Sequence, residues 1–105
     1  MLFIKKFLTL SPIYKYIISG HSMSPALLPG QSVLVNRLSY IFFQPKTGEL
    51  IAVKDPRDKK ILIKRISKIK DGKYFVLGDN EKQSTDSRSF GWTSKNDIIG
   101  KVVFP

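Results

Sequence analysis

Residues 61–69 have the sequence Ile-Leu-Ile-Lys-Arg-Ile-Ser-Lys-Ile, and this stretch decides which kind of fold the chain can form. Large aliphatic side chains dominate it and turn residues flank it, which is typical of a β-strand. Side chains of a strand alternate between its two faces, so Leu62, Lys64 and Ile66 are expected to share one face. The strand therefore carries a lysine between two apolar neighbours.

Similar short runs recur along the chain after Pro12. They are rich in Ile, Val, Phe and Tyr, and turn signals such as Pro29-Gly30 and Asp71-Gly72 separate them. No long helical period follows residue 18. We therefore predict a mostly β fold: one compact antiparallel β domain over residues 19–105 that coils or closes like a barrel. The expected strands are Tyr16–Ser19, Ser32–Arg37, Leu50–Lys54, Ile61–Ile69, Tyr74–Leu77 and Ile98–Phe104.

Residues 1–18 are interpreted as a separate N-terminal segment. Lysines and Pro12 interrupt its large apolar side chains, so no uncharged run approaches the ~20 residues that span a bilayer. The mixture of apolar and basic residues predicts a short amphipathic segment at a membrane interface. Packing of this segment on the protein's own core is the alternative.

The composition limits the chemistry that the chain can perform. Its formal net charge is +10, from 18 Lys and Arg against 8 Asp and Glu, which favours an anionic neighbour such as a membrane surface. The lysines do not form a dense block with interleaved aromatics, so nucleic acid is not the expected partner. The chain has no cysteine and only one histidine, His21, and we expect neither a metal nor a cofactor.

The segment Gly20-His21-Ser22-Met23-Ser24-Pro25 contains a candidate nucleophile. Ser22 follows an expected strand and precedes a turn directed by proline, an arrangement that exposes a hydroxyl and nearby backbone amides. His21 is adjacent, but neighbours in an extended segment point to opposite faces. The imidazole is therefore expected to face away from the Ser22 hydroxyl.

Lys64 is the better candidate for the base that Ser22 needs. A lysine that accepts a proton must have a lowered pKa, and burial among apolar groups lowers it. Lys64 has such neighbours on its own face of the expected strand. Lys101 also lies between apolar residues, but near the end of the sequence, where its amine can reach water. The alternative for Lys64 is that its amine also extends to water instead of remaining buried.

A polar loop bounded by Gly78 and Gly91 completes the candidate site. Asp86 and Arg88 are spaced to pair locally and brace this loop, and Ser84 can orient a buried amine by a hydrogen bond. The alternative is a capped turn with a surface ion pair worth ~0–1 kcal/mol.

Together these segments resemble the signal peptidase I family, whose Ser–Lys dyad is a variant of the serine-protease plan. Three boxes occur in the family's order, and the resemblance covers about residues 19–104. Ser22-Met23-Ser24-Pro25 is similar to the family's nucleophile box, and Lys64-Arg65 is similar to its general-base box. The last box is similar to Gly78-Asp79-Asn80 followed by Ser84-Thr85-Asp86-Ser87-Arg88 and Phe90-Gly91.

The resemblance implies a role for each matching residue. Ser22 would attack the scissile carbonyl, Lys64 would take its proton, and Ser84 would help to position Lys64, while Asp86 and Arg88 would hold the site in shape. The implied substrate is a protein with an N-terminal signal or pro-segment, cut after small residues. The implied location is membrane-associated, either peripheral or N-terminally anchored, with the cytoplasm as second choice.

The chain departs from the family's pattern in three places. Gly20 stands where some members have a serine that helps the oxyanion hole, which leaves the Ser22 backbone amide as the expected donor. The usual Gly-x-Pro-Gly-Asp after the base box is absent, and only 12 residues separate Arg65 from Gly78. We therefore expect a minimal catalytic core, similar to mitochondrial inner-membrane peptidase subunits and nickel-type superoxide dismutase maturation proteases.

Other interpretations of the sequence remain open. Self-cleaving SOS-type repressors also use a Ser–Lys pair on a β scaffold, but they lack the loop pattern of residues 78–91. A Ser-x-x-Lys pattern from Ser67 to Lys70 falls within an expected strand and not at a helix start. The rival from another class is a non-catalytic basic β module for nucleic acid or an anionic membrane surface. Its binding to nucleic acid would weaken steeply with salt.

Overall fold

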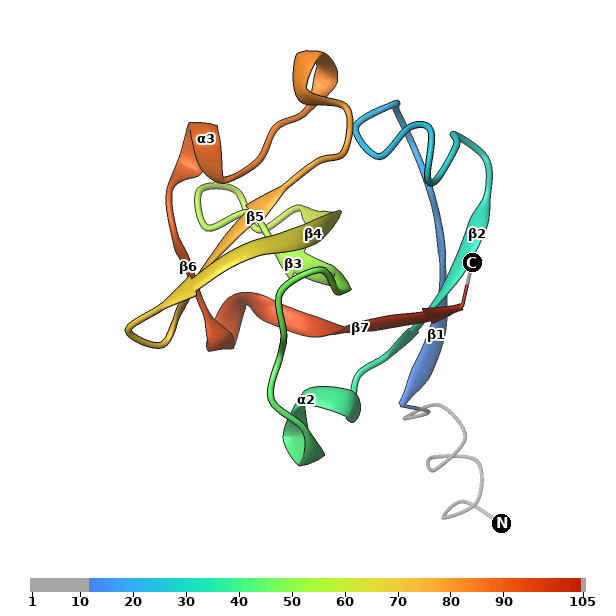
Figure 1. Ribbon diagram of the computed structural model, residues 1–105. Coiled ribbons are helices and arrows are strands. Elements are labelled where there is room, and N and C mark those ends of the chain that lie inside the picture. Colours follow the sequence, from blue (N-terminus) through green and yellow to red (C-terminus); the bar gives the residue numbers. More distant parts are fainter. Residues whose placement is uncertain (1–11, 105) are drawn as a thin grey trace, which may run out of the picture.

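The computed structural model of the protein describes residues 12–104, which form one seven-stranded sheet. The strand order is β1-β2-β7-β3-β4-β5-β6, all neighbours are antiparallel, and the sheet curls into a half-barrel (Figure 1). The strands are β1 (Ile13–Ile17), β2 (Ser32–Asn36), β3 (Leu50–Lys54), β4 (Ile61–Lys70), β5 (Lys73–Leu77), β6 (Thr93–Ser94) and β7 (Ile98–Phe104). The helices are α2 (Ser39–Phe42), α3 (Ser87–Phe90) and two 3₁₀ turns, Glu81–Gln83 and Lys95–Asp97.

The predicted mostly β, antiparallel fold is confirmed, with differences at the first strand and in the short elements. β1 begins at Ile13 and ends at Ile17, so the strand expected over Tyr16–Ser19 is shifted toward the N-terminus. Residues 1–11 lie outside the described residues, and their interfacial role stays a prediction. The sequence did not reveal β6, α2 or α3, because two to four residues are too few to show a period.

Within residues 12–104, no helix combines the length and apolar character needed to cross a membrane.

The core lies on both faces of the curled sheet, and β3 is buried on each. Ala52 belongs to one cluster, whereas its neighbours Ile51 and Val53 belong to the other, as strand alternation requires. The first cluster contains Ile18, Met23, Leu27, Val33, Val35, Ala52, Ile63 and Val102. The second contains Tyr40, Ile51, Val53, Ile66, Tyr74 and Val76.

Strand β4 has two different halves. Lys64 lies opposite the buried Ile51 of β3, on the face that Leu62 and Ile66 also occupy. Pairing with β5 begins only at Arg65. Residues 61–64 therefore have β3 along one edge and no strand of the described chain along the other.

Candidate active site

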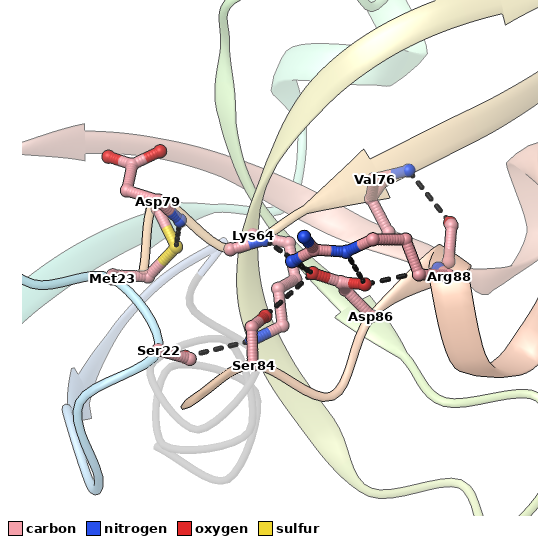
Figure 2. Close-up of polar contacts among 10 residues, drawn as sticks. Ser22, Met23, Lys64, Val76, Asp79, Ser84, Asp86 and Arg88 are labelled. Atoms are coloured by element: carbon pink, nitrogen blue, oxygen red, sulfur yellow. Dashed lines mark hydrogen bonds and ion pairs between the residues drawn. The ribbon is translucent and has the colours of Figure 1, made fainter. Parts of the chain in front are cut away.

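The structure brings Ser22 and Lys64 together, although they are 42 positions apart in the sequence. The Ser22 Oγ and the Lys64 Nζ are 2.8 Å apart (Figure 2). Lys64 is only 2% exposed. The amine thus lies in the core, with the serine hydroxyl as its hydrogen-bond partner.

The turn after β1 fixes the position of Ser22. Gly20 has a φ of 76°, a left-handed conformation that favours glycine and turns the chain out of the strand. Met23 anchors the other side, since its side chain is buried in the first core cluster. The Asn80 amide donates a hydrogen bond of 2.8 Å to the Ser22 carbonyl, so the loop after β5 holds the Ser22 turn in place.

Gly78 follows β5 and lies close to the Ser22 turn. A Cβ atom at this position would lie 2.7 Å from the Ser22 carbonyl oxygen and 2.1 Å from the Ser84 Oγ. Such contacts are too short for any side chain, and one of them involves backbone. The glycine at the start of the last box therefore permits the contact between the two loops.

Asp86 is the fully buried centre of the polar loop, with an exposed fraction of 0%. Its carboxylate accepts hydrogen bonds from the Arg88 Nε (3.0 Å) and Nη2 (2.6 Å), from the Gly78 amide (2.9 Å) and from the Ser84 hydroxyl (2.7 Å). It also caps α3 by accepting from the Arg88 amide. The Asp86–Arg88 pair expected from the spacing is present and braces the loop.

The pKa of Asp86 reflects this set of donors. Burial alone would raise it, but the hydrogen bonds from Arg88, Gly78 and Ser84 outweigh burial and hold the pKa of the carboxyl well below its usual value. Asp86 is therefore a carboxylate at neutral pH, and its charge is compensated mainly by Arg88.

Burial lowers the pKa of Lys64 below that of a free lysine. The Asp86 carboxylate acts against this shift, whereas the Arg88 guanidinium reinforces it. Arg65 lies on the opposite face of β4, where it binds the Asp79 carboxylate through its Nε (3.0 Å) and Nη2 (2.9 Å).

Ser84 and His21 contact other groups than the candidate base. The Ser84 hydroxyl donates to Asp86, and among the described residues no hydrogen bond joins Ser84 to Lys64. A direct positioning role for Ser84 thus stays a prediction. His21 is exposed, and its Nδ1 lies 3.5 Å from the Ser24 Oγ.

A cleft of about 580 Å³ opens beside Ser22 and Lys64. Its walls come from the turn after β1, from β1 itself and from the half of β4 that β5 does not cover. This cleft could not be predicted from the sequence, because it depends on two strands, β1 and β4, that come together only in the folded chain. The lining residues are Tyr16, Ile18, Ser19, Ser22, Met23, Lys59, Lys60, Ile61, Leu62, Ile63 and Lys64.

The class of the protein is that of the serine peptidases, because the signal peptidase, peptidase S26, family matches residues 1–67 and 66–105. The chain belongs to this family, and it is accordingly a serine peptidase that cleaves signal peptides. The expected similarity to the small mitochondrial and superoxide dismutase maturation proteases stays a prediction.

The related proteins cover most of the chain. A signal peptidase I of Bacillus caldolyticus is 30% identical over 139 residues, which cover 85% of this chain and 76% of that protein. Signal peptidase I V of Bacillus subtilis (strain 168) is 27% identical over 138 residues, covering 83% and 82%. A signal peptidase I of Buchnera aphidicola is 43% identical over 72 residues, covering 67% of this chain and 22% of that protein.

Replacing Asp86 with Asn tests the buried carboxylate. At pH 7 we expect Asp86→Asn to lower the free energy of unfolding by about 2 kcal/mol or more, because buried donors lose a charged acceptor. The native pKa of Asp86 is depressed, so its stabilisation is present above the unfolded value of ~3.9 and is lost as the pH falls through the native pKa. Urea unfolding at pH 7 and pH 3 should therefore show a smaller difference at pH 3.

The exposed Asp71, in the turn between β4 and β5, provides the control. Asp71→Asn should leave stability almost unchanged at both pH values. A difference for Asp86→Asn that is equally large at pH 7 and pH 3 would contradict the role assigned to the Asp86 charge.

Proposed function

We propose that the chain is an endopeptidase with a Ser–Lys dyad, in which Ser22 is the nucleophile and Lys64 the general base. The observation that carries this proposal is the 2.8 Å separation of the Ser22 Oγ from the Nζ of a lysine that is 2% exposed. A buried, neutral amine can accept a proton from a hydroxyl, whereas an exposed, protonated one cannot. A non-catalytic binding module would have no use for such a pair.

The reaction follows from this geometry. The Ser22 Oγ attacks the scissile carbonyl as its proton passes to the Lys64 Nζ, and the Ser22 backbone amide donates to the developing oxyanion. The resulting ammonium gives its proton to the leaving amine, so that the peptide bond breaks and an ester to Ser22 remains. Lys64 then takes a proton from a water molecule as that water attacks the ester, and it returns the proton to the Ser22 Oγ as the acyl–oxygen bond breaks. This step releases the acid product and restores the neutral amine.

The surrounding residues support the dyad indirectly. Asp86 and Arg88 act on Lys64 with opposite charges, and Ser84 and Gly78 bind Asp86 beside the nucleophile turn. We propose that these residues keep the Ser22 hydroxyl and the Lys64 amine at hydrogen-bonding distance. We also propose that Gly20 leaves the Ser22 amide accessible as the oxyanion donor.

The cleft supports a protein substrate bound in an extended conformation. The uncovered edge of β4 offers main-chain groups to such a segment, which is how an extended peptide is recognised by strand addition. Large side chains of Ile18, Met23 and Ile63 already line the cleft. This supports the preference, implied by the family resemblance, for small residues before the cut in a signal or pro-segment.

Substitution of the dyad tests the proposal. Ser22→Ala and Lys64→Ala should each abolish cleavage of a peptide with alanine before the cut, as measured by steady-state kinetics. The double variant should lose little more than either single variant, because nucleophile and base act as one unit. His21→Ala is the control and should retain most activity. Near-normal turnover by either dyad variant would refute the assignment, and a loss for His21→Ala as deep as that for Ser22→Ala would make His21 the base.

The pH dependence tests the state of Lys64. Only the neutral amine accepts a proton, and the pKa of Lys64 is lowered by burial. The rate at saturating substrate should therefore rise with pH through an apparent pKa below the ~10.4 of free lysine, and activity should be lost as the pH falls through that value. Rates that are flat from about pH 5 upward, or that rise only near ~10, would contradict a desolvated base.

We also propose that the protein works at an anionic membrane surface. An apolar patch of consecutive residues lies on and beside α2, where Ile41 is 69% exposed and Phe42 and Phe43 are each 73% exposed. The Arg37 amide, just before α2, donates to the Pro12 carbonyl at 2.8 Å. Pro12, where the described residues begin, therefore lies beside the segment that leads into α2, and residues 1–11, which precede it in the sequence, are apolar and basic.

This location supports joint insertion of the α2 patch and the N-terminal segment into one membrane interface, since exposed apolar patches mark such contacts and the positive charge attracts anionic lipids. The double variant Phe42→Ser/Phe43→Ser should bind vesicles containing anionic lipid several-fold more weakly in cosedimentation, with unchanged cleavage of a soluble peptide. Ile69→Ser, which removes an exposed apolar residue from β4, is the matched control. Equal vesicle binding by the double variant and this control would count against the proposal.

A further inference from the structure

One side-chain hydrogen bond crosses the cleft beside Ser22 and Lys64. The Tyr16 hydroxyl donates to the Ile61 carbonyl at 2.8 Å, and the two residues are 45 positions apart in the sequence. Tyr16 lies on β1 and Ile61 on β4, strands that are not neighbours in the sheet. Because both residues line the cleft, this bond forms a bridge between its two walls.

The Ile61 carbonyl lies on the uncovered edge of β4. The Ile66 amide donates to the Glu49 carbonyl of the chain leading into β3. The backbone groups of Ile66 therefore face β3. Because backbone groups of an antiparallel strand alternate in direction from one residue to the next, those of every second residue counted back from Ile66 also face β3. The backbone groups of Ile61 and Ile63 lie between these and face away from β3, toward the cleft. Tyr16 therefore occupies a main-chain acceptor that an incoming extended segment would otherwise use.

The bridge lies at a defined distance from the reacting groups. Ile61 precedes Lys64 by three residues, which corresponds to about 10 Å along a strand. An extended substrate has the same rise per residue. A segment of about three residues thus fits between the dyad and the bridge, and a fourth residue meets Tyr16.

The hydroxyl of Tyr16 is suited to remain a donor. A tyrosine hydroxyl keeps its proton at neutral pH, and burial raises the pKa of Tyr16 further above its usual value. A hydrogen bond of this kind exchanges with bonds to water or substrate for a small net change, equivalent to about two- to tenfold in an equilibrium constant. The bridge is therefore strong enough to affect binding and weak enough to be displaced.

We propose that Tyr16 is a specificity-determining residue that closes the far end of the cleft and competes with the substrate backbone for the Ile61 carbonyl. Segments of up to about three residues before the cut bind without disturbing the bridge, whereas longer segments must displace it. This inference rests on the proposed function, in that the residues before the cut occupy this cleft.

Tyr16→Phe tests the bridge, because it removes only the hydroxyl. The assay uses two peptides with the same cleavage site, one with three and one with six residues before the cut. We expect Tyr16→Phe to lower KM for the longer peptide by about two- to tenfold with kcat unchanged, and to leave both constants for the shorter peptide unaltered. Tyr14→Phe is the matched control: Tyr14 lies on the same face of β1, and its buried hydroxyl has no hydrogen-bond partner among the described residues.

Several results would overturn the proposed role of Tyr16 in specificity. These are an unchanged KM for the longer peptide, an equal change for both peptides, the same effect in Tyr14→Phe, or an effect that follows extension after the cut. Ser22→Ala in the same assay separates this inference from the proposed function. If Ser22→Ala is inactive and Tyr16→Phe leaves KM unchanged, only the proposed role of the bridge is refuted. If Ser22→Ala is active, the dyad is refuted, and with it the proposed function and this inference.

Discussion

The burial of the Lys64 amine is the constraint on which the rest of the site depends. An ammonium ion in the core of a small β domain would be costly without a paired anion, so the buried lysine is stabilised in its neutral form and its pKa falls. A neutral amine still needs a hydrogen-bond partner, and the Ser22 hydroxyl supplies it at 2.8 Å. The same burial that disfavours the charge thus places a proton acceptor beside a hydroxyl.

This arrangement requires that the nearby Asp86 carboxylate does not raise the pKa of Lys64 enough to restore its protonated form. Asp86 is fully buried, and its negative charge raises the pKa of Lys64. The two bonds from Arg88, with those from Gly78 and Ser84, compensate most of that charge. The polar loop therefore places a structural anion in the core while leaving burial as the largest influence on the amine.

Local patterns in the sequence predicted much of this site, whereas contacts between distant elements could not be predicted from such patterns. The face that Lys64 occupies follows from a period of two along one strand, and the Asp86–Arg88 pair follows from a spacing of two residues. The influence of Arg88 on the pKa of Lys64 could not be predicted in this way, because the two residues lie on different elements, α3 and β4. The bridge from Tyr16 to Ile61 joins strands that only the curl of the sheet brings together.

The short spacing between Arg65 and Gly78 is compatible with an intact site because of where the β4–β5 hairpin turns. The alignment to the Bacillus caldolyticus protein extends over 139 residues, more than the 105 of this chain, so that relative contains additional residues. The hairpin pairs Arg65 with Leu77 next to Lys64 and Lys70 with Lys73 at its far end, and the turn at Asp71 and Gly72 follows there. A hairpin lengthened at this turn would grow away from Lys64, so its length can change without moving Lys64 or the loop that begins at Gly78.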